Sequence, residues 1–287
     1  MMEIENVLIC GLGAIGSIYA DKIQNAKILV DKERLERYKK NPTIFNGKEL
    51  KLDYILPSCN TYKADLIIIA TKFDGLAKAV KNIKNFVGEN TLILSLLNGI
   101  TSEKFIAEHY GSRKVVNSYF IGHSAVRNGR NITQDGINTI VMGKNERIQK
   151  YFDKVGINYE ISDDIKRSMW LKFMLNVSSN QTTALTGFTF GEMLSSKKCM
   201  EFVINVMKEV QSIAKAEGVK NTDAMIEDAL KALQKMSPEG KTSMLQDIEA
   251  GRKTEVDIFA GVITELGKKY NIPTPYNKVL KELIEIY

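Results

Sequence analysis

A glycine-rich segment near the start of the chain constrains the fold more than any other feature. Residues 3–10 end in a short apolar run typical of a β-strand, and Gly11-Leu12-Gly13-Ala14-Ile15-Gly16 follows directly. A helical stretch over residues 17–24 and a second strand over residues 26–30 come next. The first glycine suits a tight turn, the second lets the backbone approach a ligand closely, and the third lets helix and strand pack together. This order predicts an α/β domain whose glycine turn binds the pyrophosphate of a dinucleotide at a helix N-terminus.

Charged residues follow the second strand, where the adenosine ribose of a dinucleotide normally binds. Asp31 lies near the offset of about 20 residues at which an acidic group takes the ribose 2′-hydroxyl, which favours NAD. Lys32 and Arg34 follow immediately. Both can bind a 2′-phosphate if Asp31 turns aside, or they simply begin a solvated helix. The residues alone leave the cofactor open between NAD and NADP.

Two later strands place polar residues at one edge of the expected sheet. The apolar runs over residues 64–71 and 91–97 are typical of buried parallel strands, and Lys72 and Asn98 follow them. Ligands bind outside the carboxyl ends of the strands in such sheets, so we expect both side chains to line one crevice. The alternative for each is an ordinary loop residue.

The remainder of the first half adds shorter elements. Asn46-Gly47 predicts a tight turn between two short strands. His123 has no identifiable partner, which favours a structural or surface histidine over acid–base chemistry. The other expected elements are a helix over 76–87, a strand over 114–122, an antiparallel addition to the same sheet over 123–143, a helix over 145–155 and a strand over 157–161.

The segment Trp170 to Asn180 is apolar apart from one polar stripe. At 3.6 residues per turn, Lys172, Asn176 and Asn180 share one face of a helix. A lysine among apolar residues is costly unless it meets a partner or a water-filled cleft, so the stripe predicts a cavity for a ligand with acceptor atoms. The alternative is a lysine whose head reaches solvent beside two exposed asparagines.

From residue 164 onward the pattern is helical almost to the end. We therefore expect a Rossmann-type dinucleotide-binding domain over residues 1–164 and an all-α domain over residues 165–287. Its helices are expected over 192–216, over 221–236, from about Ser243, from about Glu255 and over 277–286. Ser243 and Glu255 thus lie near helix N-termini, where a hydroxyl suits a ligand carboxylate, although simple capping explains both equally well.

Composition and charge argue against several classes of protein. The 287 residues carry a net charge of +6, but basic and acidic residues are interleaved, which indicates a solvated surface and no nucleic acid. Three separated cysteines and two histidines offer neither a disulfide framework nor a metal site. No apolar run approaches the ~20 residues that span a bilayer, and no signal-peptide pattern is present. We expect a cytoplasmic protein with no membrane partner.

Together these motifs resemble the ketopantoate reductase family, the 2-dehydropantoate 2-reductases that use NADPH to make pantoate for coenzyme A. The resemblance covers the whole chain. It is carried in order by GLGAIG, TK at Lys72, LNG at Asn98, the turn from His123 to Ala125, WLKFMLNVSSN and SMLQDIEAGRKTEVD. Two residues depart from the family pattern. Asp31 stands where NADPH-using members tend to have a basic group, and Phe190 stands where some members have an asparagine that contacts substrate.

The resemblance implies roles for individual residues. Lys172 would be the catalytic proton donor, and Glu255 would lie against substrate and cofactor. Asn176, Asn180 and Ser243 would bind substrate. With the glycine turn and the residues after the second strand, the expected cofactor-binding set is Gly11, Leu12, Gly13, Ala14, Ile15, Gly16, Asp31, Lys32, Lys72, Asn98, Ala125 and Glu255.

The expected reaction is hydride transfer from nicotinamide C4 to the carbonyl carbon of a small branched 2-oxo acid. The ammonium of Lys172 would polarise the carbonyl oxygen and deliver the proton, while Glu255 orients the substrate hydroxyl and Ser243 its carboxylate. The alternatives are a related NAD(P)-dependent reductase of another small 2-oxo or 3-hydroxy acid, and a non-catalytic nicotinamide-redox sensor whose helical domain binds a protein. The sequence leaves open whether the chain forms a homodimer.

Overall fold

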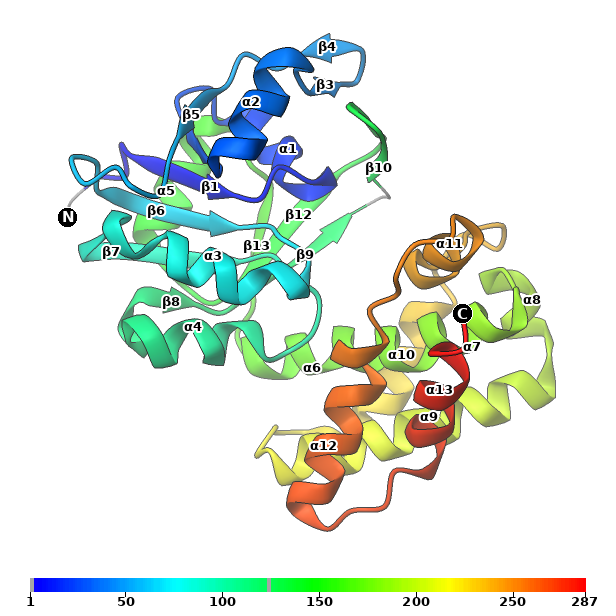
Figure 1. The fold of residues 1–287 in the computed structure, drawn as a ribbon. Coiled ribbons are helices and arrows are strands. Elements are labelled where there is room, and N and C mark those ends of the chain that lie inside the picture. Colours follow the sequence, from blue (N-terminus) through cyan, green and yellow to red (C-terminus); the bar gives the residue numbers. More distant parts are fainter. Residues whose placement is uncertain (1–2, 123–124) are drawn as a thin grey trace. The chain divides into compact units, whose positions relative to one another are not determined.

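The computed structural model describes residues 3–122 and 125–287. The expectation for His123 therefore falls outside the described residues. The chain divides into two compact units, Met1–Ile165 and Lys166–Tyr287 (Figure 1), which are described separately below.

A six-stranded parallel sheet forms the centre of the first unit. Its strands lie in the order β5-β2-β1-β6-β7-β8, and every neighbouring pair is parallel. The register pairs Cys10 with Leu29 and Ile69, and Ile69 with Ser95, so the carboxyl ends of four strands meet at one edge. The strands are β1 (Val7–Cys10), β2 (Lys27–Leu29), β5 (Asp53–Ile55), β6 (Ala64–Ile69), β7 (Val87–Ser95) and β8 (Val115–Val116).

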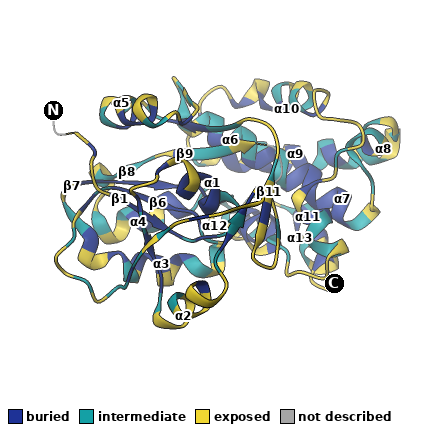
Figure 2. Cartoon of the chain, turned by 90° about the horizontal axis from the view of Figure 1, so that it is seen from above, coloured by how far each residue is buried: buried dark blue, intermediate teal, exposed yellow. Residues whose placement is uncertain are grey.

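The continuous apolar runs are buried on both faces of this sheet. Ile67 and Ile68 point to opposite faces, belong to different core clusters and are both fully buried. Figure 2 shows the strands of this sheet largely in the dark blue of buried residues. Burial on both sides is why such strands lack an alternating pattern. The helices of this unit are α1 (Ala14–Lys22), α2 (Lys32–Lys40), α3 (Leu76–Asn82), α4 (Ser102–Tyr110) and α5 (Glu146–Val155).

Two small sheets complete the first unit, and here one expectation was wrong. Residues 125–142 do not extend the parallel sheet, and the strand expected over 114–122 divides into β8 and β9. The local pattern signals strands, but the choice of partner depends on contacts distant in the sequence. One sheet has the order β10-β11-β3-β4, with β10 (Ala125–Asn128), β11 (Asn131–Gln134), β3 (Ile44–Phe45) and β4 (Lys48–Glu49). The other has the order β13-β12-β9, with β13 (Tyr159–Ile161), β12 (Asn138–Met142) and β9 (Ser118–Gly122).

The turn between β3 and β4 is as expected. Asn46 and Gly47 have φ values of 46° and 79°, so both occupy the left-handed region that a tight two-residue hairpin turn requires.

The second unit is helical. Its core is formed by inward-facing residues such as Val203, Val206 and Val210, which are fully buried at the expected helical spacing. No helix among the described residues is long and apolar enough to cross a bilayer. The elements are α6 (Ile165–Leu175), a π turn (Asn176–Asn180), α7 (Gln181–Thr186), α8 (Phe190–Ser195), α9 (Lys197–Ala216), α10 (Met225–Leu233), α11 (Ser243–Glu249), a 3₁₀ turn (Val256–Ile258), α12 (Ala260–Tyr270) and α13 (Pro275–Ile284).

Two expected helices were wrong in extent. The helix expected over 192–216 is interrupted at Ser196, whose backbone is extended and whose hydroxyl accepts the Cys199 N–H to start α9. The helix expected from Glu255 begins only at Ala260. Phe259 has φ −106° and ψ −90°, outside the helical region, and separates the 3₁₀ turn from α12.

Candidate functional site

The glycine turn has a geometry that larger residues cannot adopt. Gly11 has φ +105°, and a Cβ there would lie 2.6 Å from the Ala70 carbonyl oxygen. A Cβ on Gly16 would lie only 1.8 Å from the Gly11 oxygen. Gly13 differs, because a Cβ there would meet no heavy atom within 4 Å. The space beside Gly13 is therefore open to a ligand.

The N-terminus of α1 faces this open space. Gly13 is the N-cap residue, and no side chain in the part of the chain that the structure describes caps the helix. The N–H groups of the first turn, at Ala14, Ile15 and Gly16, therefore remain for an anion, and the positive end of the helix dipole adds to the attraction.

A cavity of about 810 Å³ lies in the first unit at the carboxyl edge of the parallel sheet. Five of the residues predicted to bind cofactor line it: Gly11, Leu12, Gly13, Asp31 and Lys72. The predicted residues that are not among its lining are Ala14, Ile15, Gly16, Lys32, Asn98 and Ala125, together with Glu255, which belongs to the second unit. Lys32 is exposed on the first turn of α2, Asn98 follows β7, and Ala125 begins β10.

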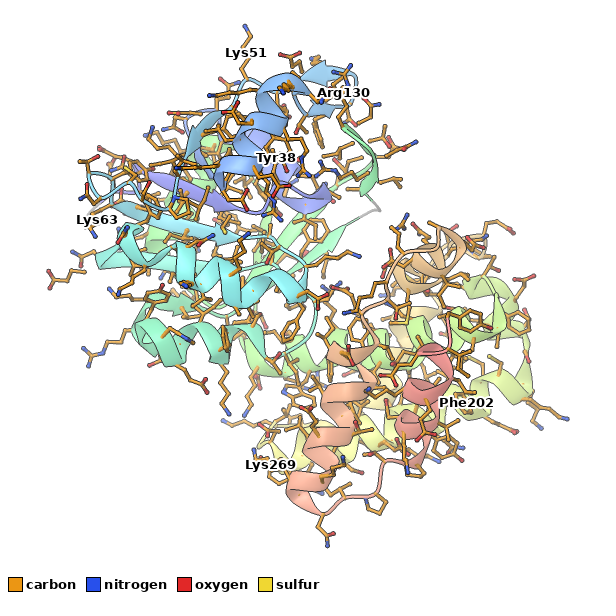
Figure 3. The ribbon with its side chains drawn as sticks, in the orientation of Figure 1. Tyr38, Lys51, Lys63, Arg130, Phe202 and Lys269 are labelled. Atoms are coloured by element: carbon orange, nitrogen blue, oxygen red, sulfur yellow. The ribbon has the colours of Figure 1, made fainter. Side chains whose placement is uncertain are left out.

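The cavity is strongly cationic. Among the described residues, its only acidic lining residue is Asp31, whereas its basic lining residues are Arg34, Arg37, Lys72, Lys78, Arg127 and Arg130. Arg130 is labelled in Figure 3, at the turn that joins β10 and β11. The sequence drew attention only to Lys72 and Arg34. A signal for Arg37 was present, because it lies three residues after Arg34 and so on the same helix face.

Asp31 is already engaged by two donors. Its carboxylate accepts the Arg34 N–H at 2.9 Å, which caps α2, and the Lys78 ammonium at 2.8 Å. The hydrogen bond from Lys78, followed by that from the Arg34 backbone, lowers the pKa of the Asp31 carboxyl below its usual value. The negative charge is thus largely offset inside the cavity. Lys78 lies on α3, and no local pattern could have linked it to Asp31.

Arg127 joins the glycine turn to the β10–β11 hairpin. Its guanidinium donates to the Leu12 carbonyl and, at 2.9 Å, to the Gly129 carbonyl. The hairpin thereby contributes to the wall of the cavity. In the sequence it is far from the glycine turn, since Leu12 and Arg127 are 115 residues apart.

In the second unit, the polar stripe does not lie on one continuous α-helix. Lys172 lies on α6 and is half-buried, whereas Asn176 and Asn180 lie in the π turn. A π turn contains more residues per turn than an α-helix, so the expectation of one regular α-helix through all three residues was wrong. Such π turns occur frequently at functional sites.

Side chains that bond to the backbone four residues earlier accompany the π turn. Ser178 donates to the Met174 carbonyl, Ser179 to Leu175, Gln181 to Val177 and Thr183 to Ser179, at 2.8, 2.6, 2.6 and 2.9 Å. These bonds satisfy carbonyl groups of a helix whose own hydrogen-bonding pattern has shifted. The run of polar residues SSNQTT, residues 178–183, was the feature of the sequence that could have indicated this π turn.

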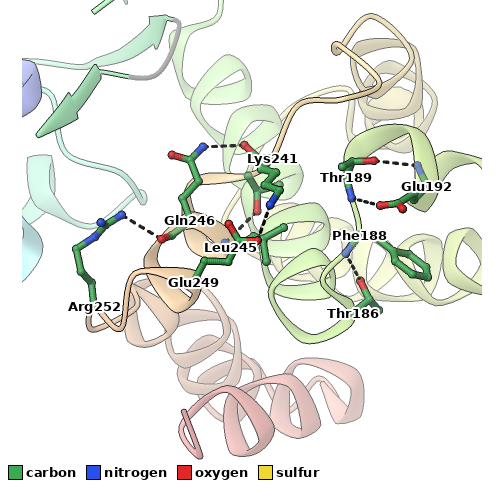
Figure 4. A network of polar contacts seen from close by, with 10 residues as sticks. Thr186, Phe188, Thr189, Glu192, Lys241, Leu245, Gln246, Glu249 and Arg252 are labelled. Atoms are coloured by element: carbon green, nitrogen blue, oxygen red, sulfur yellow. Dashed lines mark hydrogen bonds and ion pairs between the residues drawn. The ribbon is translucent and has the colours of Figure 1, made fainter. Parts of the chain in front are cut away.

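The structure brings together two of the predicted substrate-binding residues. Asn180 is 7% exposed, and its Nδ2 donates to the Ser243 hydroxyl at 3.3 Å. Ser243 is the first residue of α11, as predicted, and a set of polar contacts holds this segment in place (Figure 4). Among them, Gln246 donates to the Lys241 carbonyl at 3.0 Å and Lys241 pairs with Glu249 at 2.5 Å.

Glu255 lies at the start of the 3₁₀ turn, not in α12, and is half-buried. Gln181, which directly follows the π turn, connects it to α12. Its side-chain oxygen accepts the Ala260 N–H at 3.1 Å and so caps α12.

Comparison with known proteins identifies the family. A protein-family model described as ketopantoate reductase PanE/ApbA matches residues 7–147. A second family model, of the C-terminal part of the same reductases, matches residues 164–287. The chain belongs to the ketopantoate reductase family. The 2-dehydropantoate 2-reductases of Lactococcus lactis subsp. lactis (strain IL1403) and of Pyrococcus horikoshii are each 30% identical to it, over 97% of this chain and 96% of the relative.

Solved structures agree with the assignment. D-Mandelate dehydrogenase in complex with NADH has a TM-score of 0.86 at 25% identity, with 98% of both chains covered. A PanE/ApbA family ketopantoate reductase from Ralstonia eutropha JMP134 has the same fold, with a TM-score of 0.82 at 23% identity and 98% of both chains covered.

Family membership confirms three expectations from the sequence. The resemblance was correct, the fold combines a Rossmann-type domain with a helical domain, and the protein is an NAD(P)-dependent oxidoreductase that uses a nicotinamide cofactor. The roles of individual residues in this ketopantoate reductase family member remain predictions.

Proposed function

We propose that this protein is a 2-dehydropantoate 2-reductase that reduces ketopantoate to pantoate with NADPH. The observation that carries the proposal is the contact between the buried Asn180 and the exposed Ser243, on a helical unit that also presents Lys172. An amide and a hydroxyl in contact can both donate to a carboxylate, which is the group that every 2-oxo acid shares. The curated relatives named above support ketopantoate as the substrate.

Each residue has a distinct task in the proposed reaction. Asn180 and Ser243 bind the substrate carboxylate, Asn176 holds the substrate from the same turn, and Glu255 accepts a hydrogen bond from the substrate hydroxyl. When bound, the nicotinamide supplies a hydride to the carbonyl carbon. The protonated amine of Lys172 donates to the carbonyl oxygen and transfers its proton there, so that the oxygen becomes a hydroxyl. The neutral amine then regains a proton from solvent.

The charge of the cavity supports NADPH over NADH. Arg34 and Arg37 lie on one face of α2, beside the position where the adenosine ribose of a dinucleotide normally binds. Guanidinium groups bind phosphate through two parallel hydrogen bonds. Because the oxygens of Asp31 are engaged by Lys78 and by the helix N-terminus, this carboxylate does not prevent a 2′-phosphate from binding.

A second candidate is an NADH-dependent reductase of another 2-oxo acid. The solved D-mandelate dehydrogenase, described with NADH and anilino(oxo)acetate, has a TM-score of 0.84 and 25% identity to this chain.

Steady-state kinetics with both cofactors and a panel of 2-oxo acids tests the proposal. We expect ketopantoate with NADPH to give the highest kcat/KM, at least tenfold above ketopantoate with NADH. A higher kcat/KM for an aromatic 2-oxo acid such as phenylglyoxylate, or for NADH, would establish the second candidate instead.

A further inference from the structure

Buried hydroxyl groups link the π turn to the start of α11. Thr183 Oγ1 lies 2.7 Å from Thr242 Oγ1, and both residues are at most 3% exposed. Thr242 Oγ1 also accepts the Leu245 N–H at 3.3 Å, and Thr183 Oγ1 lies 2.9 Å from the Ser179 carbonyl oxygen. Neither threonine has a role in the reaction described above.

The direction of this series of hydrogen bonds follows from the groups at its two ends. An N–H group only donates and a carbonyl only accepts. Leu245 therefore donates to Thr242, Thr242 donates to Thr183, and Thr183 donates to Ser179. Each hydroxyl gives its proton and accepts another, and consecutive bonds of this kind strengthen one another in a buried setting.

The two segments joined by these hydrogen bonds carry the residues proposed to bind the carboxylate. Ser179 directly precedes Asn180, and Thr242 directly precedes Ser243. The direct contact between Asn180 and Ser243 is 3.3 Å long, whereas the contact between the threonines is 2.7 Å. The shorter and fully buried contact thus holds the two segments together more firmly than the pair itself.

The distance between Asn180 and Ser243 determines whether both can bind one carboxylate. Asn180 Nδ2 carries two N–H groups and uses one of them on Ser243 Oγ. Its second N–H and the proton of Ser243 are then donors close enough to meet the two oxygens of one carboxylate. A small change in the distance between the segments would separate these donors.

We propose that Thr183 and Thr242 are positioning residues, which hold Asn180 and Ser243 at the spacing that a 2-oxo acid carboxylate requires. This inference rests on the proposed function, because it assumes that these two side chains bind the substrate. The threonines themselves do not touch the substrate.

The test compares Thr183→Val, Thr183→Ser and Thr182→Val. Valine keeps the shape of threonine but removes the hydroxyl and leaves Thr242 without an acceptor, whereas serine keeps the hydroxyl. Thr182 is the matched control: it is the adjacent residue, 3% exposed, and its hydroxyl has no partner among the described residues. Steady-state KM for ketopantoate, fluorescence titration with NADPH and hydrogen exchange of the α11 amides are measured for all three.

We expect Thr183→Val to raise the KM for ketopantoate about three- to tenfold, the factor that loss of one buried hydrogen bond brings. The Kd for NADPH should stay within twofold of the wild-type value, and the α11 amides should exchange faster. Thr183→Ser and Thr182→Val should behave as the wild type does. If Thr183→Val does not fold, Thr183→Cys provides the same comparison, since a thiol of similar size bonds only weakly.

An unchanged KM in Thr183→Val, or an equal rise in Thr182→Val, overturns the inference. Failure of the proposed function gives a different result, namely a wild-type enzyme that does not reduce ketopantoate. The KM comparison then uses the 2-oxo acid that the wild type does reduce. The same rise is expected with that acid because its carboxylate is the same, and an unchanged KM there overturns the inference as well.

Discussion

Replacing the glycines of the turn by alanine should separate folding from cofactor binding. A Cβ on residue 16 would lie 1.8 Å from the Gly11 oxygen, a backbone atom, and real Cβ atoms essentially never come within 3.0 Å. The turn and α1 would therefore have to move apart by at least 1.2 Å, given those two distances. At Gly13 the added Cβ meets no heavy atom within 4 Å, and φ is −84°, which alanine adopts readily.

The expected magnitudes differ accordingly. Overpacking costs about 1–3 kcal/mol, and a clash with backbone belongs at the upper end of that range. About 3 kcal/mol lowers the Tm of a unit of this size by roughly 6–12 °C. Gly13→Ala should leave Tm within about 2 °C, because the weaker N-cap is offset by the lower entropy of the unfolded chain. It should still raise the Kd for NADPH about tenfold or more, since the Cβ occupies the space where the pyrophosphate would lie and one hydrogen bond to a charged group is worth about 1.5–3 kcal/mol.

Differential scanning fluorimetry and fluorescence titration with NADPH check the two variants side by side. Gly16→Ala should lose both stability and affinity, and Gly13→Ala affinity alone. If Gly13→Ala bound NADPH as tightly as the wild type, the open space beside this residue would not be the pyrophosphate site. A wild-type Tm for Gly16→Ala would refute the clash.

Three further predictions concern charged groups. Lys172→Ala should lower kcat by about 10²–10⁴, the usual contribution of a general acid, with an unchanged Kd for NADPH; near-normal turnover would remove Lys172 from the mechanism. Arg34→Gln should raise the Kd for NADPH about tenfold and that for NADH less than twofold, and equal changes would place the 2′-phosphate elsewhere. The pKa of the Asp31 carboxyl is lower in the folded protein than in the unfolded chain, where it is about 3.9. The ion pair with Lys78 therefore stabilises the fold at pH values above the unfolded pKa. This contribution is lost as the pH falls through the folded pKa. Asp31→Asn should therefore lose less stability than the wild type between about pH 5 and pH 3 in thermal melts, by at most about 1 kcal/mol for so exposed a pair, and parallel curves would contradict this.

Features encoded in a short stretch of sequence were predicted well. The glycine turn, the buried strands β6 and β7 and the Asn46-Gly47 hairpin each depend on a local requirement, such as positive φ or burial on two faces. The residue types at those positions are the ones that meet the requirement.

Features that depend on distant partners were not predicted. Asp31 was interpreted from its offset alone, and its engagement by Lys78 appears only when α3 packs beside β2. Similarly, β11 pairs with β3, with Asn131 opposite Ile44 and Ile132 opposite Phe45. The residues of each pair are 87 positions apart in the sequence, and no local signal specifies that pairing.

The π turn was missed for a different reason. Its side-chain bonds are local, but each of the residues involved also occurs in ordinary helices, so the helical period dominated the interpretation. The signal for a departure from α-helical bonding is that Ser178, Ser179, Gln181 and Thr183 follow one another so closely.

The π turn also makes the length of this segment as important as its composition. It accommodates a residue that a regular helix of the same rise would exclude. Deleting any one residue between Asn176 and Asn180 would restore regular winding and shorten the separation of Lys172 and Asn180 from eight residues to seven. Among homologous chains, those that share the Asn180–Ser243 pair should therefore vary in the identity of these residues more readily than in their number.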